Sequence, residues 1–287
     1  MSRKRLTPTP VVEKPTLVEA PIVIVGTGNM GGAIAKGLGQ AGFASRLVLI
    51  DPAIHTHDFQ ELVGHGARLQ QKPDNIAAEK PAALVLAIKP QLMVQVAPLY
   101  RECASNALTI SIAAGTSIAS LQSWLGSSAA LVRAMPNLPA TIGKGISAAC
   151  ATPATSASQR QFAETLLRAV GDFVWLPEEE LLDAVTAVSG SGPAYVFHLV
   201  EALSSAAQAV GIPLAVADLL ARRTIEGAGA LLEHSPDTPT NLRESVTSPA
   251  GTTEAALRIL MTDQRLEILM IEAVEAATRR ARELSKS

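Results

Sequence analysis

The alternation of apolar and polar positions changes character near residue 177 of the chain. Before that point, short apolar runs rich in β-branched residues alternate with helical stretches, which is typical of βαβ units and a largely parallel sheet. The runs that we expect as strands are 22–25, 47–50, 83–88, 108–114, 130–135, 145–150 and 173–176. After that point, helical stretches separated by Gly, Pro and Ser predict an all-helical unit.

The change of pattern predicts a domain at 21–177 and a second domain at 178–287, preceded by a flexible tail at 1–20. The tail combines a basic start with three prolines and has no periodic apolar face. A chloroplast or mitochondrial targeting peptide is disfavoured, because Glu13 and Glu19 lie where such peptides avoid acidic residues.

The helical half carries more apolar surface than it can bury alone. Its helical stretches at 194–210, 213–233 and 262–284 are rich in apolar residues and alanine. Such a surplus indicates a partner surface, and identical subunits most often meet across a two-fold axis. We therefore expect a homodimer, or a higher homo-oligomer built on dimers.

Composition and charge narrow the classes of partner. The chain has 287 residues, 48% of them hydrophobic, and a formal net charge of −2, so it lacks the basic footprint of a protein that binds nucleic acid or anionic membranes. Apolar runs such as 82–88 are too short to cross a bilayer, and no apolar signal-peptide core follows the basic N-terminus. We expect a cytoplasmic protein that acts on a small molecule.

The two cysteines, Cys103 and Cys150, form no CxxC pair and have no nearby histidine in the sequence. Neither a disulfide framework nor a metal site is expected. Both cysteines are predicted to be buried small residues.

A glycine motif lies between the first predicted strand and the first predicted helix. In "IVIVGTGNMGGAIAKGL", Gly26, Gly28 and Gly31 form GxGxxG in the context that a dinucleotide-binding fold requires. The glycines permit a tight turn and let a pyrophosphate approach the N-terminus of the helix. The alternative is a tight turn with a structural role only.

Other candidate ligand contacts follow later strands. Asp51 lies twenty residues after Gly31, where an acid can accept hydrogen bonds from the adenosine ribose and so favour NAD over NADP. An Asp that forms a turn with Pro52 explains it equally well. "LAIKPQ" and "SIAAGT" also end strands, where open α/β sheets bind ligands, and the small residues of the second leave room for a nicotinamide. Lys89 of the first stretch can equally be a solvated lysine.

The stretch "VTSPAGTTEAAL" at 246–257 precedes a helix-forming run and has two interpretations. Its hydroxyl residues can cap the first turn of that helix. Alternatively, the unpaired N–H groups and the positive dipole end of the helix can hold a carboxylate or phosphate.

Six stretches in a fixed order connect these observations across residues 21–284. They are "GTGNMGGAIAKGL", "LAIKPQ", "SIAAGTSI", "RAMPNLPA", "AVSGSGPAYVF" and "VTSPAGTTEAAL". In this order they resemble pyrroline-5-carboxylate reductases, which catalyse the last step of proline synthesis. The resemblance implies an α/β fold, with an N-terminal Rossmann-like NAD(P)-binding domain and a C-terminal all-helical dimerisation domain that intertwines with a second subunit. It also implies reduction of the cyclic imine 1-pyrroline-5-carboxylate to L-proline, with NADPH as the expected cofactor and NADH as the alternative.

In that family the substrate lies between the nicotinamide and the loop at 246–257. The substrate contacts that the resemblance implies are Ser248, Gly251, Thr252 and Thr253, with the substrate carboxylate on them. The cofactor contacts that it implies are Gly26, Thr27, Gly28, Asn29, Met30, Gly31, Asp51, Asn75, Ala87, Ile88, Lys89, Pro90, Ile112, Ala113 and Ala114.

One position departs from the family pattern. The family usually has two glycines after the Ser-Pro of this loop, whereas Ala250 occupies the first place here. If the backbone there needs a positive φ, alanine costs roughly 1 kcal/mol or more.

The implied reaction asks little of the side chains. A protonated imine is already electrophilic, so positioning against the nicotinamide can supply much of the rate. We expect Thr253 to bond the substrate nitrogen or carboxylate, with water or the protonated substrate as the proton source. Tyr195 and His198 on a later helix are more often packing residues than site residues.

Three alternatives remain. A hydroxyacid dehydrogenase needs a general acid/base for its alcohol, and no Lys or His stands in a matching helical motif. An imine reductase for a homologous ring differs only in pocket shape. A non-catalytic NAD(P)-binding protein predicts binding without turnover, and the intact "SPAGTT" stretch argues against it.

Overall fold

A computed structural model describes residues 20–285, so the tail expected at 1–20 lies outside the described residues except for Ala20. Its centre is one eight-stranded sheet in the order β3-β2-β1-β4-β5-β6-β7-β8. The strands are β1 (Ile22–Val25), β2 (Leu47–Ile50), β3 (Arg68–Gln70), β4 (Ala83–Leu86), β5 (Leu108–Ser111), β6 (Leu131–Met135), β7 (Gly145–Ala151) and β8 (Gly171–Trp175). Neighbouring strands are parallel except for β6 and β7, which are antiparallel. The predicted largely parallel sheet is confirmed.

Helices cover both faces of this sheet. They are α1 (Asn29–Leu38), α2 (Gln60–Gly64), α3 (Pro90–Val96), α4 (Arg101–Ala104), α5 (Ile118–Leu125) and α6 (Ala157–Arg168). The short helical turns of the described residues are η1 (Gly39–Phe43), η2 (Ala44–Arg46), η3 (Thr56–Phe59), η4 (Ala77–Glu79), η5 (Ala97–Tyr100), η6 (Leu138–Ile142), η7 (Thr186–Gly190) and η8 (Thr262–Gln264).

The strand sequences explain the layers. Successive side chains of a strand point to opposite faces, so a strand covered on both faces is apolar at every position. In β1, Ile22 and Ile24 belong to the core beneath α1 and α6. Val23 and Val25 belong to the opposite core, beneath α3 and α5. All four side chains are at most 4% exposed.

The strand order reverses between β1 and β4, which are neighbours although two strands separate them in sequence. The helix after β1 lies on one face, and the helix after β4 lies on the other. In such sheets a crevice opens at the carboxyl ends of the two strands, and ligands bind there. The fold therefore places its crevice beside the glycine motif.

Two strands end earlier than the apolar runs predicted. The runs at 83–88 and 108–114 leave the sheet after Leu86 and Ser111. The remaining residues of each run form loops at the carboxyl edge, beside the crevice. The edge strand β3 was not predicted, because its sequence Arg-Leu-Gln is not an apolar run.

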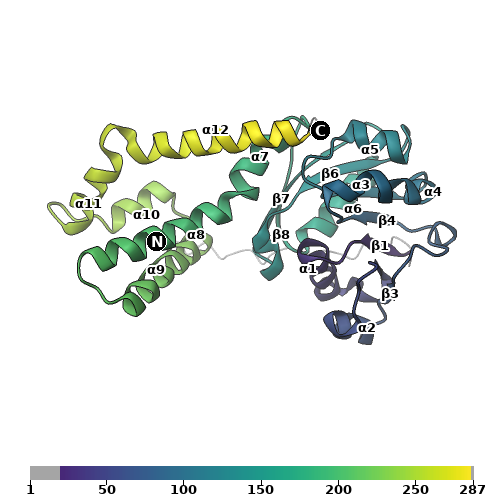
Figure 1. The fold of residues 1–287 in the computed structure, drawn as a ribbon, viewed down its shortest axis with the longest axis horizontal. Coiled ribbons are helices and arrows are strands. Elements are labelled where there is room, and N and C mark those ends of the chain that lie inside the picture. The colour runs from purple at the N-terminus through teal and green to yellow at the C-terminus, as the bar shows by residue number, and fades with distance from the viewer. Residues whose placement is uncertain (1–19, 286–287) are drawn as a thin grey trace, which may run out of the picture.

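The second half forms a helical arm beside the sheet (Figure 1). Its helices are α7 (Leu181–Val185), α8 (Gly192–Ala209), α9 (Leu214–His234), α10 (Pro239–Ser245), α11 (Thr252–Met261) and α12 (Arg265–Ser285). α8 packs along α9, and α12 returns from α11 to pack against α7. In Figure 1, α10 and α11 lie at the end of the arm away from the sheet, whereas α12 ends next to it. The three predicted helical stretches correspond to α8, α9 and α12.

A polar cluster joins the arm to the sheet. Arg133 of β6 has a side chain only 7% exposed, and its Nη1 lies 2.6 Å from Oε1 of Glu179 while its Nη2 lies 3.7 Å from Oδ1 of Asp183. The same Glu179 oxygen accepts a hydrogen bond from the N–H of Ile118. At the end of α12, Ser285 donates to Asp183. Both ends of the arm are thus tied to one buried arginine.

The arm leaves much of its apolar surface uncovered. Phe197 of α8 is 55% exposed and Ile271 of α12 is 56% exposed. In α11 no residue is buried, and in α12 only Ala281 is. In residues 20–285, no helix is both long and apolar enough to cross a membrane. The predicted surplus of apolar surface is therefore present.

Candidate functional site

The glycine motif forms the turn between β1 and α1, and two of its glycines are needed for packing. Gly26 has φ +88°, and a Cβ there would lie 2.5 Å from the carbonyl oxygen of Ala87. A Cβ on Gly31 would lie 2.9 Å from the Cβ of Ala87 and closer still to the Gly26 carbonyl oxygen. These two positions let α1 and β4 approach the turn closely.

Gly28 differs, because a Cβ there would meet nothing within 4 Å. It precedes α1 as the N-cap, where the first backbone N–H groups of a helix have no partner within the helix. Gly28 lines a cavity of about 440 Å³. The lining residues are Thr27, Gly28, Asn29, Gly32, Ala33, Lys36, Asp51, Ala53, Ile54, Asp58, Phe59 and Thr141. Met30, two residues after Gly28, is partly buried against the core instead.

Asp51 lies at the carboxyl end of β2 and is bonded in two directions. Its Oδ2 accepts a hydrogen bond from the N–H of Thr27 at 2.8 Å, and its Oδ1 accepts one from the N–H of Ala53 at 2.9 Å. The second contact is the Asp-Pro turn that the sequence offered as an alternative. The first contact ties the end of β2 to the glycine turn.

The loops after β4 and β5 leave the sheet side by side. The N–H of Ala87 donates to Val25, and the N–H of Ile112 donates to Leu86. Ala113 is 4% exposed, whereas Ala114 is exposed. Pro90 and Ala114 line a second cavity, of about 500 Å³, which the end of α12 also lines. Alanine side chains therefore lie at the edge of the sheet next to the glycine turn, and they extend only a short way from the backbone.

Ile88 and Lys89, the remaining predicted contacts in the loop after β4, differ in exposure. Ile88 is partly buried against the core, and its Cγ2 would lie 3.0 Å from a Cβ on Gly26. Lys89 is exposed at the N-cap of α3 and forms no ion pair within residues 20–285. It is a solvated lysine beside the crevice.

Asn75 does not line the cavity at Gly28. It has φ +56° and lines a different cavity, of about 320 Å³, with Tyr100 and Cys103 among its neighbours. Of the predicted cofactor contacts, the ones that line the cavity at Gly28 are Thr27, Gly28, Asn29 and Asp51.

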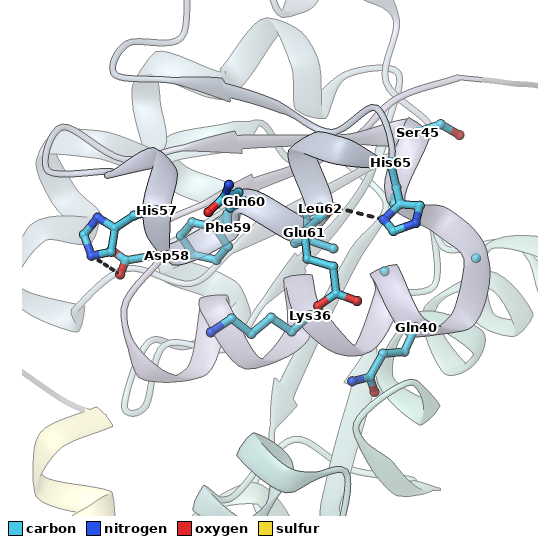
Figure 2. Close-up of a pocket in the computed structure, with 13 residues that line it drawn as sticks. Lys36, Gln40, Ser45, His57, Asp58, Phe59, Gln60, Glu61, Leu62 and His65 are labelled. Carbon is cyan, nitrogen blue, oxygen red and sulfur yellow. Dashed lines mark hydrogen bonds and ion pairs between the residues drawn. The ribbon is translucent and has the colours of Figure 1, made fainter.

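Another cavity, of about 670 Å³, lies between α1 and the η3–α2 segment and contains none of the predicted site residues (Figure 2). It shares Lys36, Asp58 and Phe59 with the cavity at Gly28. The Lys36 Nζ lies 5.7 Å from the centroid of the Phe59 ring, and His57 pairs with Asp58 at 2.9 Å. Lys36, Asp58 and Glu61 bring both signs of charge to its wall, which favours no single charge of ligand.

The loop at 246–251 connects α10 to α11, and Gly251 is the N-cap of α11. The N–H of Gly251 donates to the carbonyl oxygen of Ser248 at 3.0 Å. A Cβ built on Gly251 would also lie 3.0 Å from that oxygen. Thr252 and Thr253 open the helix, where N–H groups lack partners within the helix. Within the described part of the chain, the hydroxyls of Ser248, Thr252 and Thr253 make no hydrogen bond. The helix begins here as expected, but none of these three hydroxyls caps it.

Ala250 has the positive φ for which the sequence predicted a cost in alanine. Its φ is +59°, in the left-handed region that costs an alanine roughly 1 kcal/mol or more. Its N–H donates to Oε2 of Glu254 in the first turn of α11. The loop therefore retains a left-handed backbone conformation at position 250, which favours glycine, although the residue there is alanine.

Tyr195 and His198 on α8 differ in their surroundings. The Tyr195 hydroxyl donates to the carbonyl oxygen of Ala187 at 3.0 Å. His198 has a side chain 81% exposed, and its Nδ1 lies 3.0 Å from a carboxylate oxygen of Glu201. The Tyr195 contact agrees with the packing interpretation, whereas His198 lies on the surface and is not packed within residues 20–285.

Cys103 and Cys150 are free and buried, as predicted. Burial, with a smaller contribution from Glu179, raises the pKa of the Cys150 thiol to about 11. In the region that the structure covers, no three His, Cys, Asp or Glu side chains are grouped as metal ligands would be.

The two halves of the predicted site do not meet within one chain. The glycine turn and the loops after β4 and β5 lie at the sheet, whereas the loop before α11 lies at the far end of the arm (Figure 1). A pocket that needs both halves must take one of them from a second copy.

Known proteins match the chain over most of its length. The family of pyrroline-5-carboxylate reductase dimerisation domains matches residues 179–284, and the family of coenzyme F420-dependent NADP oxidoreductases matches residues 21–115. A pyrroline-5-carboxylate reductase of Pseudomonas aeruginosa is 38% identical over 267 residues, covering 92% of this chain and 97% of the relative. The chain belongs to the pyrroline-5-carboxylate reductase family.

Solved structures of the family agree with this assignment. A pyrroline-5-carboxylate reductase from Coxiella burnetii superposes with a TM-score of 0.86 at 33% identity, covering 94% of this chain and all of that one. The enzyme from Plasmodium falciparum, with NADP bound, superposes with a TM-score of 0.77 at 25% identity, covering 93% and 98%. The expected fold is confirmed, with a Rossmann-type domain followed by a helical dimerisation domain. Membership also confirms an NAD(P)-dependent oxidoreductase that forms homo-oligomers.

Sequence reasoning missed eight residues that line the cavity at Gly28, namely Gly32, Ala33, Lys36, Ala53, Ile54, Asp58, Phe59 and Thr141. Thr141 follows the stretch "RAMPNLPA", so that motif was a signal for it. Gly32, Ala33 and Lys36 lie in the stretch "GTGNMGGAIAKGL", so that motif was a signal for them. Ala53, Ile54, Asp58 and Phe59 belong to no motif, and the segment after β2 reaches the cavity because Ile54 and Phe59 pack in the same core as α1.

Proposed function

We propose that this chain reduces 1-pyrroline-5-carboxylate to L-proline with NAD(P)H. The observation that carries the proposal is the open surface at Gly28, beside the small-residue loops after β4 and β5, in a chain of this family. We also propose 21–177 as the cofactor domain and 178–287 as the helical domain.

The cofactor domain binds and orients the nicotinamide nucleotide, which supplies the hydride when bound. Gly28 and the first N–H groups of α1 hold the pyrophosphate, since a helix N-terminus attracts anions. Asp51 receives the adenosine ribose. Ala113 and Ala114 lie beside the ring, where larger side chains would block it.

The loop before α11 binds the substrate carboxylate through the N–H groups of Gly251, Thr252 and Thr253 and the Ser248 hydroxyl. The first turn of α11 supports this role, because its N–H groups and dipole favour an anion. The Thr253 hydroxyl is unpaired within residues 20–285 and is free to bond the imine nitrogen or the carboxylate. No acidic side chain is required, because the imine reacts in its protonated form and positioning supplies the rate.

The substrate loop of one copy completes the cofactor site of another. The distance between the two halves in Figure 1 and the exposed apolar faces of α8, α11 and α12 both support a two-fold homodimer, or an oligomer built on such dimers.

Purified full-length protein assayed with pyrroline-5-carboxylate and each reduced cofactor tests the function. We expect cofactor oxidation that depends on the imine, with proline as the product. Absence of turnover with both cofactors in a folded dimer would contradict the proposal. Faster turnover of a six-membered cyclic imine would instead favour a reductase for the homologous ring.

We further propose that the protein works in the cytoplasm, as its composition suggested. Fractionation of cells of the source organism, followed by immunoblotting, tests this location.

A further inference from the structure

Asp51 is fixed in place at the adenosine end of the candidate cofactor site. Both of its carboxylate oxygens accept backbone hydrogen bonds, from Thr27 at 2.8 Å and from Ala53 at 2.9 Å. Bonds to an ionised acceptor are stronger than neutral ones, so rotation of the carboxylate away from the cavity would break two strong contacts. A carboxylate offers about four acceptor positions, which leaves two for ligand hydroxyls.

The charges around this carboxylate are mostly negative. Among the described residues that line the cavity, Asp51 and Asp58 are acidic and Lys36 is the only cation. The Lys36 ammonium lies 5.7 Å from the centroid of the Phe59 ring on an exposed face of α1. Its charge is therefore shared with water and an aromatic face rather than directed at Asp51.

Neither Arg68 nor His55 offsets the negative charge of the Asp51 carboxylate. Arg68 pairs in register with Val48, toward the amino end of β2, so it lies away from the edge that carries Asp51. Its two terminal nitrogens both bond the Glu79 carboxylate. His55 is exposed and stacks on His57 at 5.8 Å, and neither histidine lines the cavity.

We infer that this chain binds NAD(H) more tightly than NADP(H), with Asp51 as the residue that selects. The inference rests on the proposed function only in placing a dinucleotide in this cavity. A free ribose 2′-hydroxyl can donate to the fixed carboxylate, whereas a 2′-phosphate offers only acceptors and a like charge. Both nucleotides share the remaining contacts, so NADPH can still be used at higher concentration.

Isothermal titration calorimetry of the full chain measures this selectivity without turnover. The ligands are NAD⁺ and NADP⁺, together with ADP and 2′,5′-ADP, which isolate the adenosine half. We expect a Kd for NAD⁺ at least ten-fold lower than that for NADP⁺. The Kd for ADP should likewise be lower than that for 2′,5′-ADP. Asp51→Ser should shift the ratio at least ten-fold toward NADP⁺.

Asp51→Asn is the second variant, because it removes the charge while retaining an oxygen that can accept from Thr27. It should shift the ratio in the same direction, and melting curves verify that both variants fold. Glu61→Gln is the matched control, since this exposed acid on α2 does not line the cavity at Gly28. Its ratio should equal that of the wild type.

Wild-type protein that binds NADP⁺ as tightly as NAD⁺ overturns the inference, even if imine reduction is observed. Unchanged ratios in both Asp51 variants overturn it as well. Selective loss of NADP⁺ binding in Lys36→Gln, with tight NADP⁺ binding in the wild type, would assign the 2′-phosphate to Lys36 instead. Protein that binds neither nucleotide overturns both the inference and the proposed function.

Discussion

Gly26 and Gly28 belong to one motif but meet different surroundings. Gly26 needs a positive φ and has the Ala87 carbonyl where a Cβ would go, whereas Gly28 has an ordinary φ of −63° and empty space. Gly26 therefore serves the fold. Gly28 leaves room for a ligand.

Substitution of each glycine by alanine should separate these roles. Gly28→Ala should lower the free energy of unfolding by no more than about 1 kcal/mol, because a favourable N-cap is lost. It should weaken cofactor binding at least ten-fold, because its Cβ enters the pyrophosphate path. Gly26→Ala should lower the free energy of unfolding by about 2 kcal/mol or more, through strain and the clash. Urea denaturation and nucleotide titration measure both effects, and unchanged cofactor affinity in Gly28→Ala would contradict the assigned site.

The Thr253 hydroxyl tests the substrate loop at the same scale. Because the hydroxyl has no hydrogen-bond partner in the described residues, Thr253→Ala should change the free energy of unfolding by less than about 0.5 kcal/mol. If the hydroxyl bonds the substrate, kcat/KM for pyrroline-5-carboxylate should fall about ten-fold or more while cofactor affinity is retained. Normal kcat/KM with a lowered melting temperature would return Thr253 to a structural role.

Ala250 provides a further residue-scale test. Ala250→Gly relieves the left-handed strain at φ +59° but adds unfolded-state entropy, so we expect a net gain of about 0.5 to 1 kcal/mol in stability. Ala256→Gly is the matched control, because an exposed helix interior loses about 1 kcal/mol with the same change. Equal destabilisation of both variants in thermal denaturation would show that Ala250 carries no strain in solution.

At the scale of elements, the sequence predicts strands that are buried on both faces and misses strands that pairing alone creates. β1, β2 and β4 are continuous apolar runs, whereas β3 reads Arg-Leu-Gln and exists through its ladder with β2. The glycine turn was predictable because its signal is local. Asp58 and Phe59 were not, since they reach the cavity from η3, which carries no motif. The φ of Ala250 likewise depends on how the chain enters α11, which spacing does not reveal.

The joint between arm and sheet leads to an element-scale prediction. Arg133→Met leaves Glu179 and Asp183 without their cation in a largely buried position, which should cost about 2 kcal/mol or more. Arg168→Met is the control, because its ion pair with Glu164 is exposed and should cost less than about 1 kcal/mol. Urea denaturation compares the two variants, and equal losses would show that the Arg133 cluster is not a structural joint.

At the scale of the whole molecule, an arm with exposed apolar helices and a distant substrate loop implies that each site is built from two chains. Mixing two inactive variants tests this arrangement. One carries Gly28→Asp, which places a charge against the pyrophosphate, and the other carries Thr253→Ala together with Gly251→Ala, whose new Cβ meets Ser248. A hybrid dimer with shared sites holds one intact site, formed by the intact cofactor domain of one chain and the intact loop of the other.

Random exchange of equal amounts of the two variants should therefore restore about one quarter of the wild-type activity, since about half of the dimers are hybrids with one of two sites intact. If each site lay within a single chain, every site in the hybrid would keep one defect and mixing would restore nothing. The exchange is driven by brief dilution below the dimer dissociation range, and light scattering before and after the assay verifies that dimers reform. The parent variants exchanged separately provide the baseline. Activity at that baseline, with hybrids demonstrated by a mass tag on one chain, would place the complete site in one subunit and require the arm to fold back onto its own sheet.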